Sequence, residues 1–303
     1  MALEQGTSSV ALSAGSAATA RAGGDRWRAV KPYGQVAAFA VAVAVLAPAM
    51  VDARSSERLV NLWLVYSAVA VGFYWVFGLA GRFAFSHTFM MALGAYSSAW
   101  FTRHGDGRPM LAGVVVAAVV AGLVAAIIGL LLHRSEGFYF AIATLSVTQV
   151  GFVVFSRWTD FTGPNGVVVG VSPISLGGRR YVEDTEVFWL FLVILTLLLF
   201  AAVFIERSPL RRRAIAARDN AIVAGTLGLP VLRVQLTLFV LGSVVAAVVG
   251  AFTAHWTGFV STESFGLELA IGVFLMVVLG GAHSMWGPVL GAAFYVALPE
   301  ILS

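Results

Sequence analysis

Few residues of this chain could carry out covalent or metal chemistry. Its 303 residues include no cysteine, one lysine (Lys31) and five histidines, at positions 87, 104, 133, 255 and 283. No pair of histidines has the spacing of a zinc-binding helix, and no serine lies in a G-x-S-x-G turn. Lys31 is followed by proline, so the Gly-Lys-Ser/Thr of a phosphate-binding loop is absent as well. The sequence therefore predicts a conduit or scaffold, with no catalytic residue, no metal and no cofactor.

Four polar residues within apolar runs are candidates for lining a path across a membrane: Ser86, His87, Thr144 and Glu268. Polar groups in a membrane span usually face the interior of the bundle. Ser86 and His87 therefore either line a path or form hydrogen bonds between helices. Glu268 lies two or three residues from the end of its run, so simple exposure at the membrane interface is the alternative.

A basic, helix-forming segment from Ser208 to Pro230 stands between two long apolar runs. The preceding run, Val187 to Ile205, has 19 residues without a charge, and the following one, Val234 to Ala254, has 21. A polar loop of this length between two spans is expected to face the cytoplasm and to dock a partner there. Its candidate contact residues are Arg211, Arg212, Arg213, Ala217, Arg218, Asp219, Ala224 and Gly228. Gly228 is expected to take a turn that a β-branched residue cannot adopt.

The elements that position these residues are predicted to be membrane helices. Hydrophobic residues make up 59% of the chain and charged residues 11%, and the mean hydropathy is +0.90. Nine apolar runs are long enough to count as candidates: 36–51, 59–80, 83–102, 109–132, 138–156, 187–205, 234–254, 266–282 and 285–302. The sequence therefore predicts an all-α polytopic membrane protein of about 8–10 transmembrane or re-entrant helices. The half-polar run 83–102 is expected to be broken or re-entrant if it does not cross.

The distribution of charge predicts the topology. If the N-terminus is cytoplasmic and the first eight runs each cross once, the inner segments hold 12 of the 19 basic residues and five acids. The outer segments hold seven basic residues and eight acids, so the net charge is +7 inside and −1 outside. The positive-inside rule then favours a cytoplasmic N-terminus, with the loop 207–230 on the same side. The basic excess thus indicates topology and contact with membrane lipid, and we expect no nucleic-acid partner.

Small residues predict where helices touch. Two series recur every four residues: Gly113, Ala117, Ala121, Ala125 and Gly129 in one run, and Gly242, Ala246, Gly250 and Ala254 in another. Such faces let two helix backbones approach closely inside a membrane. We expect both series to lie in a tightly packed bundle formed by residues 35–303.

The first 34 residues are predicted to form a disordered cytoplasmic tail, because they are rich in alanine, glycine and serine and have no apolar face. A cleaved secretory signal is the alternative, with Arg26, Arg28 and Lys31 before the apolar stretch 36–47 and a small-residue site near Ala53.

Several blocks of the sequence resemble the LivM-type permease subunits of branched-chain amino acid ABC importers. The blocks are spread over residues 80–300 in the order of that family: Gly81–Tyr96, Gly137–Leu145, Thr162–Gly166, Ser208–Leu229, Ala254–Phe265 and Met276–Ala292. The resemblance implies an inner-membrane permease that forms the path together with a second permease subunit. It also implies two ATPase subunits, which would hold the Ser208–Leu229 loop, and a periplasmic or lipoprotein substrate-binding protein. Asn165 is the candidate contact of the binding protein, although its neighbours Gly163, Pro164 and Gly166 first of all predict a turn residue.

The chain departs from the family pattern in places. Only the histidine of the family's Ser-Leu-Gly-His stands in Ala84–His87, and Ala221 and Gly225 replace acids that are usual in the coupling loop. Gly272 stands where a glutamate is often found, with Glu268 one turn earlier. Relatives usually continue past Ser303 into one more apolar helix. The sequence does not separate leucine, isoleucine and valine from urea, amides or aromatic acids as cargo.

A secondary transporter or channel for a small solute is the rival interpretation. It would require charged residues deep within several spans, and only Glu268 comes near to that.

Deletion of residues 1–32, with Lys31 or a nearby basic residue kept as the orientation signal, is expected to leave membrane insertion intact, since the segment has no apolar face to bury. Membrane fractionation of the truncated and full-length chains measures this. Loss of insertion with the charge retained would favour a folded or cleaved segment.

Overall fold

The fold is a bundle of long helices, as predicted. The computed structural model describes residues 32–46, 54–104, 108–135, 137–176 and 179–302. Each of the nine apolar runs contains a helix: Pro32–Leu46, α2 (Arg54–Tyr74), α3 (His87–Arg103), α4 (Met110–Leu131), α5 (Gly137–Arg157), α7 (Asp184–Arg207), α10 (Val231–Thr257), α11 (Leu267–Gly280) and α12 (Gly287–Leu302). The expected tail of 34 residues overlaps the first helix by three residues, and its residues 1–31 lie outside the described part of the chain.

Six segments in the described ranges are long and apolar enough to cross a membrane by themselves. They are Glu57–Leu79, Met110–Leu131, Gly137–Arg157, Asp184–Arg207, Val231–Thr257 and Thr262–Gly280. The helix Pro32–Leu46, α3 and α12 are shorter. The 17 residues of α3 extend over about 25 Å, less than the roughly 30 Å of a hydrocarbon core. The half-polar run 83–102 is broken, because its first four residues are not helical and only the rest forms α3.

Both predicted small-residue series are buried. The five residues of the first series face inward from α4 toward α3 and α10, and the four of the second lie on the buried side of α10. One close approach is between α3 and α10, where a methyl group on Gly94 would overlap the backbone of Ala247 and one on Gly250 would overlap that of Met91. A second is between α11 and α12, where a methyl group on Gly291 would overlap the backbone of Met276. Helix α2 packs against α7, α10 and α12.

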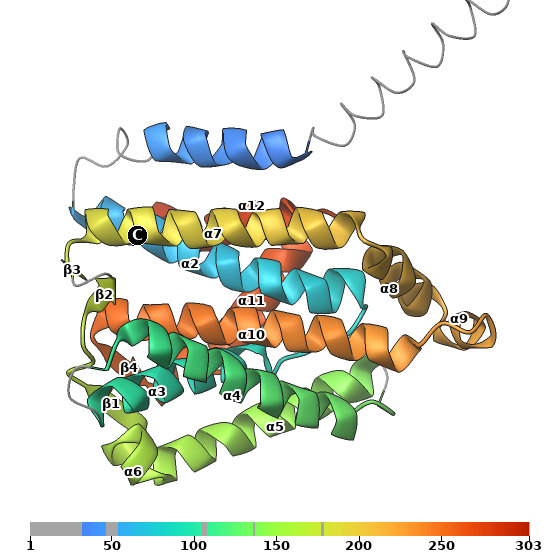
Figure 1. Cartoon of the computed structure of the whole chain (residues 1–303), viewed down its shortest axis with the longest axis horizontal. Helices are drawn as coiled ribbons and strands as arrows, with labels where there is room; N and C mark the ends of the chain where they lie inside the picture. The colour runs from blue at the N-terminus through green and yellow to red at the C-terminus, as the bar shows by residue number, and fades with distance from the viewer. Residues whose placement is uncertain (1–31, 47–53, 105–107, 136, 177–178, 303) are drawn as a thin grey trace, which may run out of the picture.

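The two ends of the bundle differ in structure (Figure 1). At one end α7 leads into two short helices, α8 (Pro209–Asp219) and α9 (Ala221–Thr226). Tyr33 lies at this end too, because its ring stacks on Phe200 at 6.1 Å and lies 5.1 Å from the guanidinium of Arg207. The start of the first helix and the loop 207–230 therefore share one end, as the charge distribution predicts.

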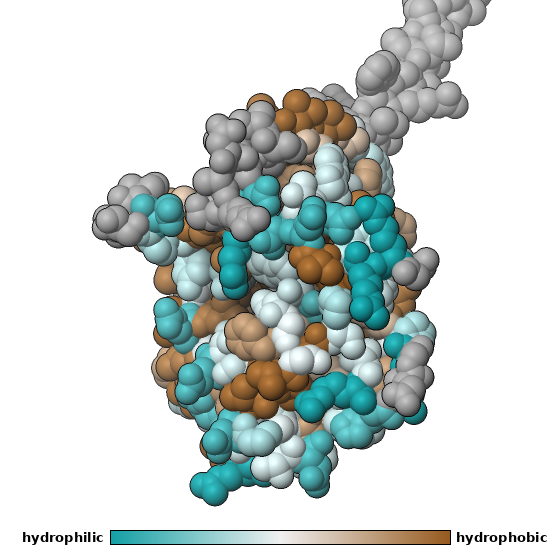
Figure 2. Space-filling view, turned by 90° about the vertical axis from the view of Figure 1, so that its left-hand side faces the viewer, coloured by the Kyte–Doolittle hydropathy of each residue, from teal (hydrophilic) through white to brown (hydrophobic). Residues whose placement is uncertain are grey.

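The opposite end carries short strands and turns, shown face-on in Figure 2. Strand β1 (Val167–Val169) pairs antiparallel with β4 (Phe259–Ser261), and β2 (Ile174–Leu176) pairs antiparallel with β3 (Arg179–Tyr181). The remaining pieces here are α6 (Thr159–Thr162), η2 (Pro164–Gly166) and η3 (Thr262–Phe265). Apolar and hydrophilic side chains alternate over this face.

Asp184, the first residue of α7, ties three long helices together at the stranded end. Its carbonyl oxygen accepts a hydrogen bond from the Asn61 amide of α2 at 3.0 Å. Its carboxylate accepts one from the Trp256 indole of α10 at 2.9 Å. Nearby, the buried His255 ring bonds to Ser98 of α3 at 2.9 Å and to the Ser172 carbonyl at 2.7 Å. The stranded end is thus held by polar contacts between distant segments.

Replacing Gly94 with alanine is expected to destabilise the protein, because the new methyl group must push α3 and α10 apart. Overpacking of this kind costs about 1–3 kcal/mol. The matched control is Gly34→Ala, since a methyl group there meets no atom within 4 Å. Thermal unfolding of the detergent-solubilised protein measures both. Equal midpoints for the two variants would contradict the close α3–α10 contact.

Candidate functional site

The basic segment predicted to dock a partner is a helical pair with capped ends. The Ser208 hydroxyl accepts the Leu210 N–H at 3.2 Å, and Pro209 occupies the first turn of α8. The cluster Arg211–Arg213 begins in the same first turn and continues into the second. Asn220 separates α8 from α9, and its side chain accepts the Val223 N–H at 3.0 Å. The chain then turns back toward α10 through Gly228, whose φ of +77° favours glycine, as predicted.

The exposed face of this segment differs from the expected one. The sequence pattern places Ala217 and Ala224 on the face offered to a partner, but each is only 2% exposed because both pack against the chain's own helices. The side chains that project outward are Ile222, Val223 and Leu227, which are 81%, 51% and 76% exposed. Sequence periodicity alone could not distinguish the two faces, because both are apolar.

Arg218 connects this segment to the bundle. Its guanidinium donates to the Gly78 carbonyl oxygen at 2.8 Å and lies 3.2 Å from the carboxylate of its neighbour Asp219. Its aliphatic carbons press on Gly81, where a Cβ would overlap them. Gly81 also has a φ of +69°, so both the contact and the backbone favour glycine. The residues that Arg218 touches belong to the break between α2 and α3.

That break begins with a change in helical pitch. The last turn of the α2 segment is the π-helix η1 (Trp75–Leu79), and the N–H groups of Gly81 and Arg82 still bond back to the carbonyls of Phe77 and Val76 at 3.0 Å each. The Tyr74 hydroxyl, just before η1, donates to the Glu206 carboxylate at the end of α7 at 2.8 Å. π-Helical turns often mark functional sites, and this one lies where α7 passes into α8.

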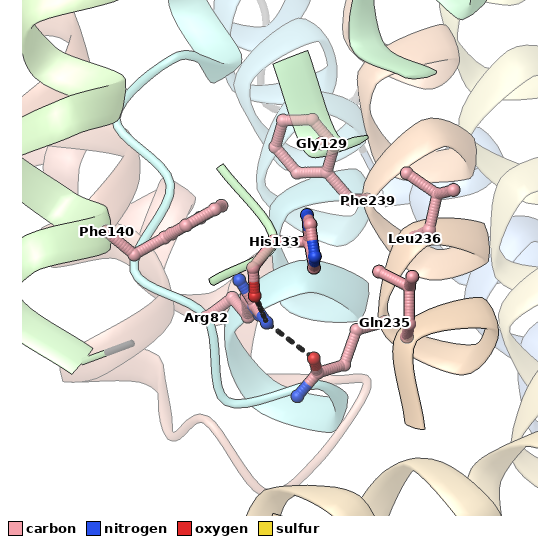
Figure 3. Close-up of a pocket in the computed structure, with 8 residues that line it drawn as sticks. Arg82, Gly129, His133, Phe140, Gln235, Leu236 and Phe239 are labelled. Atoms are coloured by element: carbon pink, nitrogen blue, oxygen red, sulfur yellow. Dashed lines mark hydrogen bonds between the residues drawn. The ribbon is translucent and has the colours of Figure 1, made fainter. Parts of the chain in front are cut away.

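Arg82 anchors the other side of the break (Figure 3). Its guanidinium donates to the carbonyls of Ser135 and His133 at 3.1 and 3.3 Å and to the Gln235 side chain of α10 at 2.6 Å. It also lies 4.7 Å from the centre of the Phe140 ring. The cavity beside it measures about 10 Å³, room for roughly one water. Sequence reasoning counted Arg82 only as a topology charge. The feature of the sequence that could have indicated its anchoring role is its position as the single charged residue between two apolar runs.

The non-helical residues 83–86 connect Arg82 to α3 and are called the extended segment for their reach along the bundle. The Phe85 N–H donates to the Thr144 hydroxyl at 3.1 Å, and the Thr148 hydroxyl donates to the Phe85 carbonyl at 3.3 Å. Both threonines project from α5 and are buried. Thr144, a candidate path residue, thus holds the extended segment in place by a direct hydrogen bond.

Ser86 and His87 are buried where α3 begins. His87 is 2% exposed, lies against α2 through an edge contact with Phe73 at 5.4 Å, and approaches Gly242 of α10. Neither of its ring nitrogens has a hydrogen-bond partner of normal geometry, although the ring lies close to the backbone of Val69 on α2, and the Ser86 hydroxyl has no partner. Whether these two residues line a path or join two helices stays a prediction.

Glu268 and Asn165 lie at the stranded end, apart from the break. Glu268 is exposed in the first turn of α11, which agrees with a position at the membrane interface. Asn165 has a φ of 55°, within the Pro164–Gly166 turn, so it serves the turn as its flanking residues predicted. Near that turn a cavity of about 240 Å³ opens between Trp100, His104 and Val168. The described residues include no cluster of histidine, cysteine and acidic groups that could hold a metal ion.

These features define a multi-pass membrane permease. It is a close-packed helical bundle with a broken helix, and the short helices α8 and α9 contact the break through Arg218. The sequence model of the family "Branched-chain amino acid transport system / permease component" matches residues 55–303, and the chain belongs to that family. It is a transport permease subunit of the ABC importer type and a multi-pass inner-membrane protein.

Curated relatives agree with this assignment. The chain is 30% identical over 290 residues to the high-affinity branched-chain amino acid transport system permease protein LivM of Escherichia coli (strain K12), covering 87% of this chain and 68% of that protein. It is 26% identical over 262 residues to the permease protein LivH of the same organism, covering 80% and 83%. The L-arabinose ABC transporter permease protein AraH of Azospirillum brasilense is 28% identical over 278 residues, covering 89% and 78%. The chain thus spans about two thirds of the length of LivM. No solved structure matches it.

Arg82→Gln is expected to lower the thermal stability of the protein, because three acceptors from the α4–α5 turn and α10 lose a charged donor. Hydrogen bonds to charged groups contribute about 1.5–3 kcal/mol each. Arg212→Gln is the control, since Arg212 is exposed on α8. Thermal unfolding in detergent measures the difference. A shift no larger than that of the control would show that Arg82 does not hold the break.

Proposed function

We propose that this chain is one of two permeases of an ABC importer for branched-chain amino acids or similar small polar compounds. A related permease completes the path, two ATPase subunits bind at the α8–α9 end, and a periplasmic or lipoprotein binding protein delivers cargo at the stranded end. The N-terminus lies in the cytoplasm. The observation that carries the proposal is the contact of Arg218 with Gly78 and Gly81, because it connects an exposed docking helix to a break in a membrane helix.

The exposed side chains of the docking segment support an ATPase partner. Ile222, Val223 and Leu227 project from a segment that also carries the exposed Arg212 and Arg213. Apolar anchors within a charged rim are the usual composition of a protein interface. The chain has no phosphate-binding motif of its own, so the energy for transport comes from a separate subunit.

The cytoplasmic side is assigned from charge. The start of the first helix, the α4–α5 turn and the α8–α9 segment share one end of the bundle, and the basic excess lies in these segments. By the positive-inside rule this end faces the cytoplasm. The stranded end then faces outward. Its cavity of about 240 Å³ and the Asn165 turn give it an uneven surface that a binding protein can contact.

The cargo class follows from the relatives. LivM and LivH are named for branched-chain amino acids, whereas AraH is named for L-arabinose and a further relative, LsrC of Klebsiella pneumoniae, for autoinducer 2. The two LivM proteins are 30% and 29% identical over 87% and 86% of this chain, whereas LsrC is 29% identical over only 53% of it, which favours branched-chain amino acids. Identification of the compound bound by the cognate binding protein tests this assignment directly.

The double variant Ile222→Asp, Leu227→Asp is expected to reduce the ATPase stimulation that loaded binding protein causes in the reconstituted complex. Interface anchors contribute about 2 kcal/mol or more each, so the loss should exceed about tenfold. Arg212→Ala is the control and should have little effect, because a rim charge contributes about 0–1 kcal/mol. Full stimulation by the double variant would refute the docking assignment.

A substitution at a buried position separates docking from folding. Ala217→Leu is expected to lower thermal stability together with coupling, because Ala217 packs inside the chain. The exposed double variant should leave thermal stability unchanged.

A further inference from the structure

Four phenylalanine rings gather beside the break in the helix. They are Phe77 of η1, Phe83 and Phe85 of the extended segment, and Phe274 of α11. The Phe77 ring lies 4.7 Å from Phe83 and 5.4 Å from Phe274, and the Phe274 ring lies 6.0 Å from Phe83 and 5.9 Å from Phe85. Three separate segments of the chain therefore meet in one aromatic cluster.

The cluster reaches the surface of the chain. Phe83 is 36% exposed, and Phe77, Phe85 and Phe274 are partly buried, while the residues beside them, Ala84 and Ser86, are fully buried. The extended segment thus turns its phenylalanines outward and its small residues inward. The rings are the part of the segment that anything outside this chain would meet.

The depth of the cluster limits what can cover it. Phe85 bonds to Thr144 and Thr148, which stand 7 and 11 residues after the start of α5, or about 10–17 Å along that helix. The segment thus runs from the end of the bundle where Arg82 is anchored to near the middle of a core roughly 30 Å thick. Irregular backbone at that depth is not found facing lipid, even where its polar groups are bonded to neighbouring side chains. Such backbone occurs only against protein or beside water.

Buried polar groups without a hydrogen-bond partner of normal geometry lie near the cluster. They are the Ser86 hydroxyl and both ring nitrogens of His87. Ser86 follows Phe85 in the chain, and His87 contacts Phe73, which stacks on Phe77 at 5.9 Å. A displacement of the rings would therefore bring a polar solute or water toward groups that can bind it.

The base of the cluster is held by the docking segment. Phe77 is in η1, one residue before Gly78, whose carbonyl accepts from Arg218, and Phe83 follows Gly81, against which the Arg218 chain packs. A movement of α8 is thus transmitted to the segments that carry two of the four rings.

We propose that Phe77, Phe83, Phe85 and Phe274 form an aromatic gate on the cytoplasmic half of the transport path, and that Arg218 positions it. The gate accommodates the apolar side chain of a small solute and closes the path to water when α8 is in the position seen here. This inference rests on the proposed function.

Cysteine accessibility tests the location of the gate. The chain has no native cysteine, so Phe83→Cys and Phe274→Cys each introduce a single thiol. Leu123→Cys and Leu197→Cys are controls, because these residues are 62% and 63% exposed on the mid-regions of α4 and α7. A water-soluble maleimide is applied to the reconstituted complex without nucleotide, with ATP and with ATP plus vanadate.

We expect the gate cysteines to react severalfold faster than the controls in at least one state, and at rates that differ between states. Rates no higher than the controls in every state would overturn the proposal, since lipid or the partner permease would then cover the rings.

Passive leak provides the second measurement. Phe83→Ala and Phe274→Ala are expected to raise ATP-independent uptake of radiolabelled L-leucine severalfold in proteoliposomes, whereas Phe204→Ala, a 69% exposed residue of α7, should not. Arg218→Ala should make the maleimide rates insensitive to nucleotide, and Arg212→Ala should leave them sensitive. An unchanged leak in the two gate variants would also contradict the gate.

The labelling assay needs no substrate, so it tests the gate proposal independently of the cargo assignment. If the wild-type complex fails to take up leucine with ATP and binding protein while the gate thiols still respond to nucleotide, the cargo assignment fails and the gate stands. ATP-dependent leucine uptake with inert gate thiols would refute the gate and leave the cargo assignment intact.

Discussion

The constraint on which the rest of this structure depends is the need to satisfy backbone hydrogen bonds at the break between α2 and α3. Inside a membrane each unpaired backbone group costs several kcal/mol. The chain meets this cost in two ways: η1 supplies carbonyls to Gly81 and Arg82, and two threonines of α5 supply hydroxyls to Phe85. The break is therefore possible only because α5 lies beside it.

Two arginines hold the base of this break in different ways. Arg82 has acceptors on the α4–α5 turn and on α10, and these belong to the close-packed part of the bundle. Arg218 belongs to a short helix at the edge, and its contact with the break is one hydrogen bond and the packing of its aliphatic chain. The side of the break that Arg82 holds is thus fixed to the bundle, whereas the side that Arg218 contacts moves together with α8.

Sequence alone predicted the helices and their closest faces, because apolar length and four-residue spacing are local properties. The buried series on α4 and α10 and the glycine at 228 followed from such patterns. The exposed side of α8 and α9 did not, since alanines and isoleucines are apolar on both faces and only the tertiary packing of Ala217 and Ala224 decides between them. The contacts of Arg82 depend on residues 51 to 153 positions away, which no local pattern encodes. The short strands were missed for the same reason, because β1 pairs with β4 across about ninety residues of sequence.

Helix α7 has the geometry of a lever. Asp184 fixes its first residue to α2 and α10, whereas its last turn contacts Tyr74 through Glu206 and continues into α8. Its 24 residues give an arm of about 36 Å. A tilt of about 5° around the Asp184 pivot would therefore displace the far end by roughly 3 Å, about the length of one hydrogen bond. Since the arm is long and its pivot is at the stranded end, a small change of angle at one end of the bundle becomes a full change of contacts at the other.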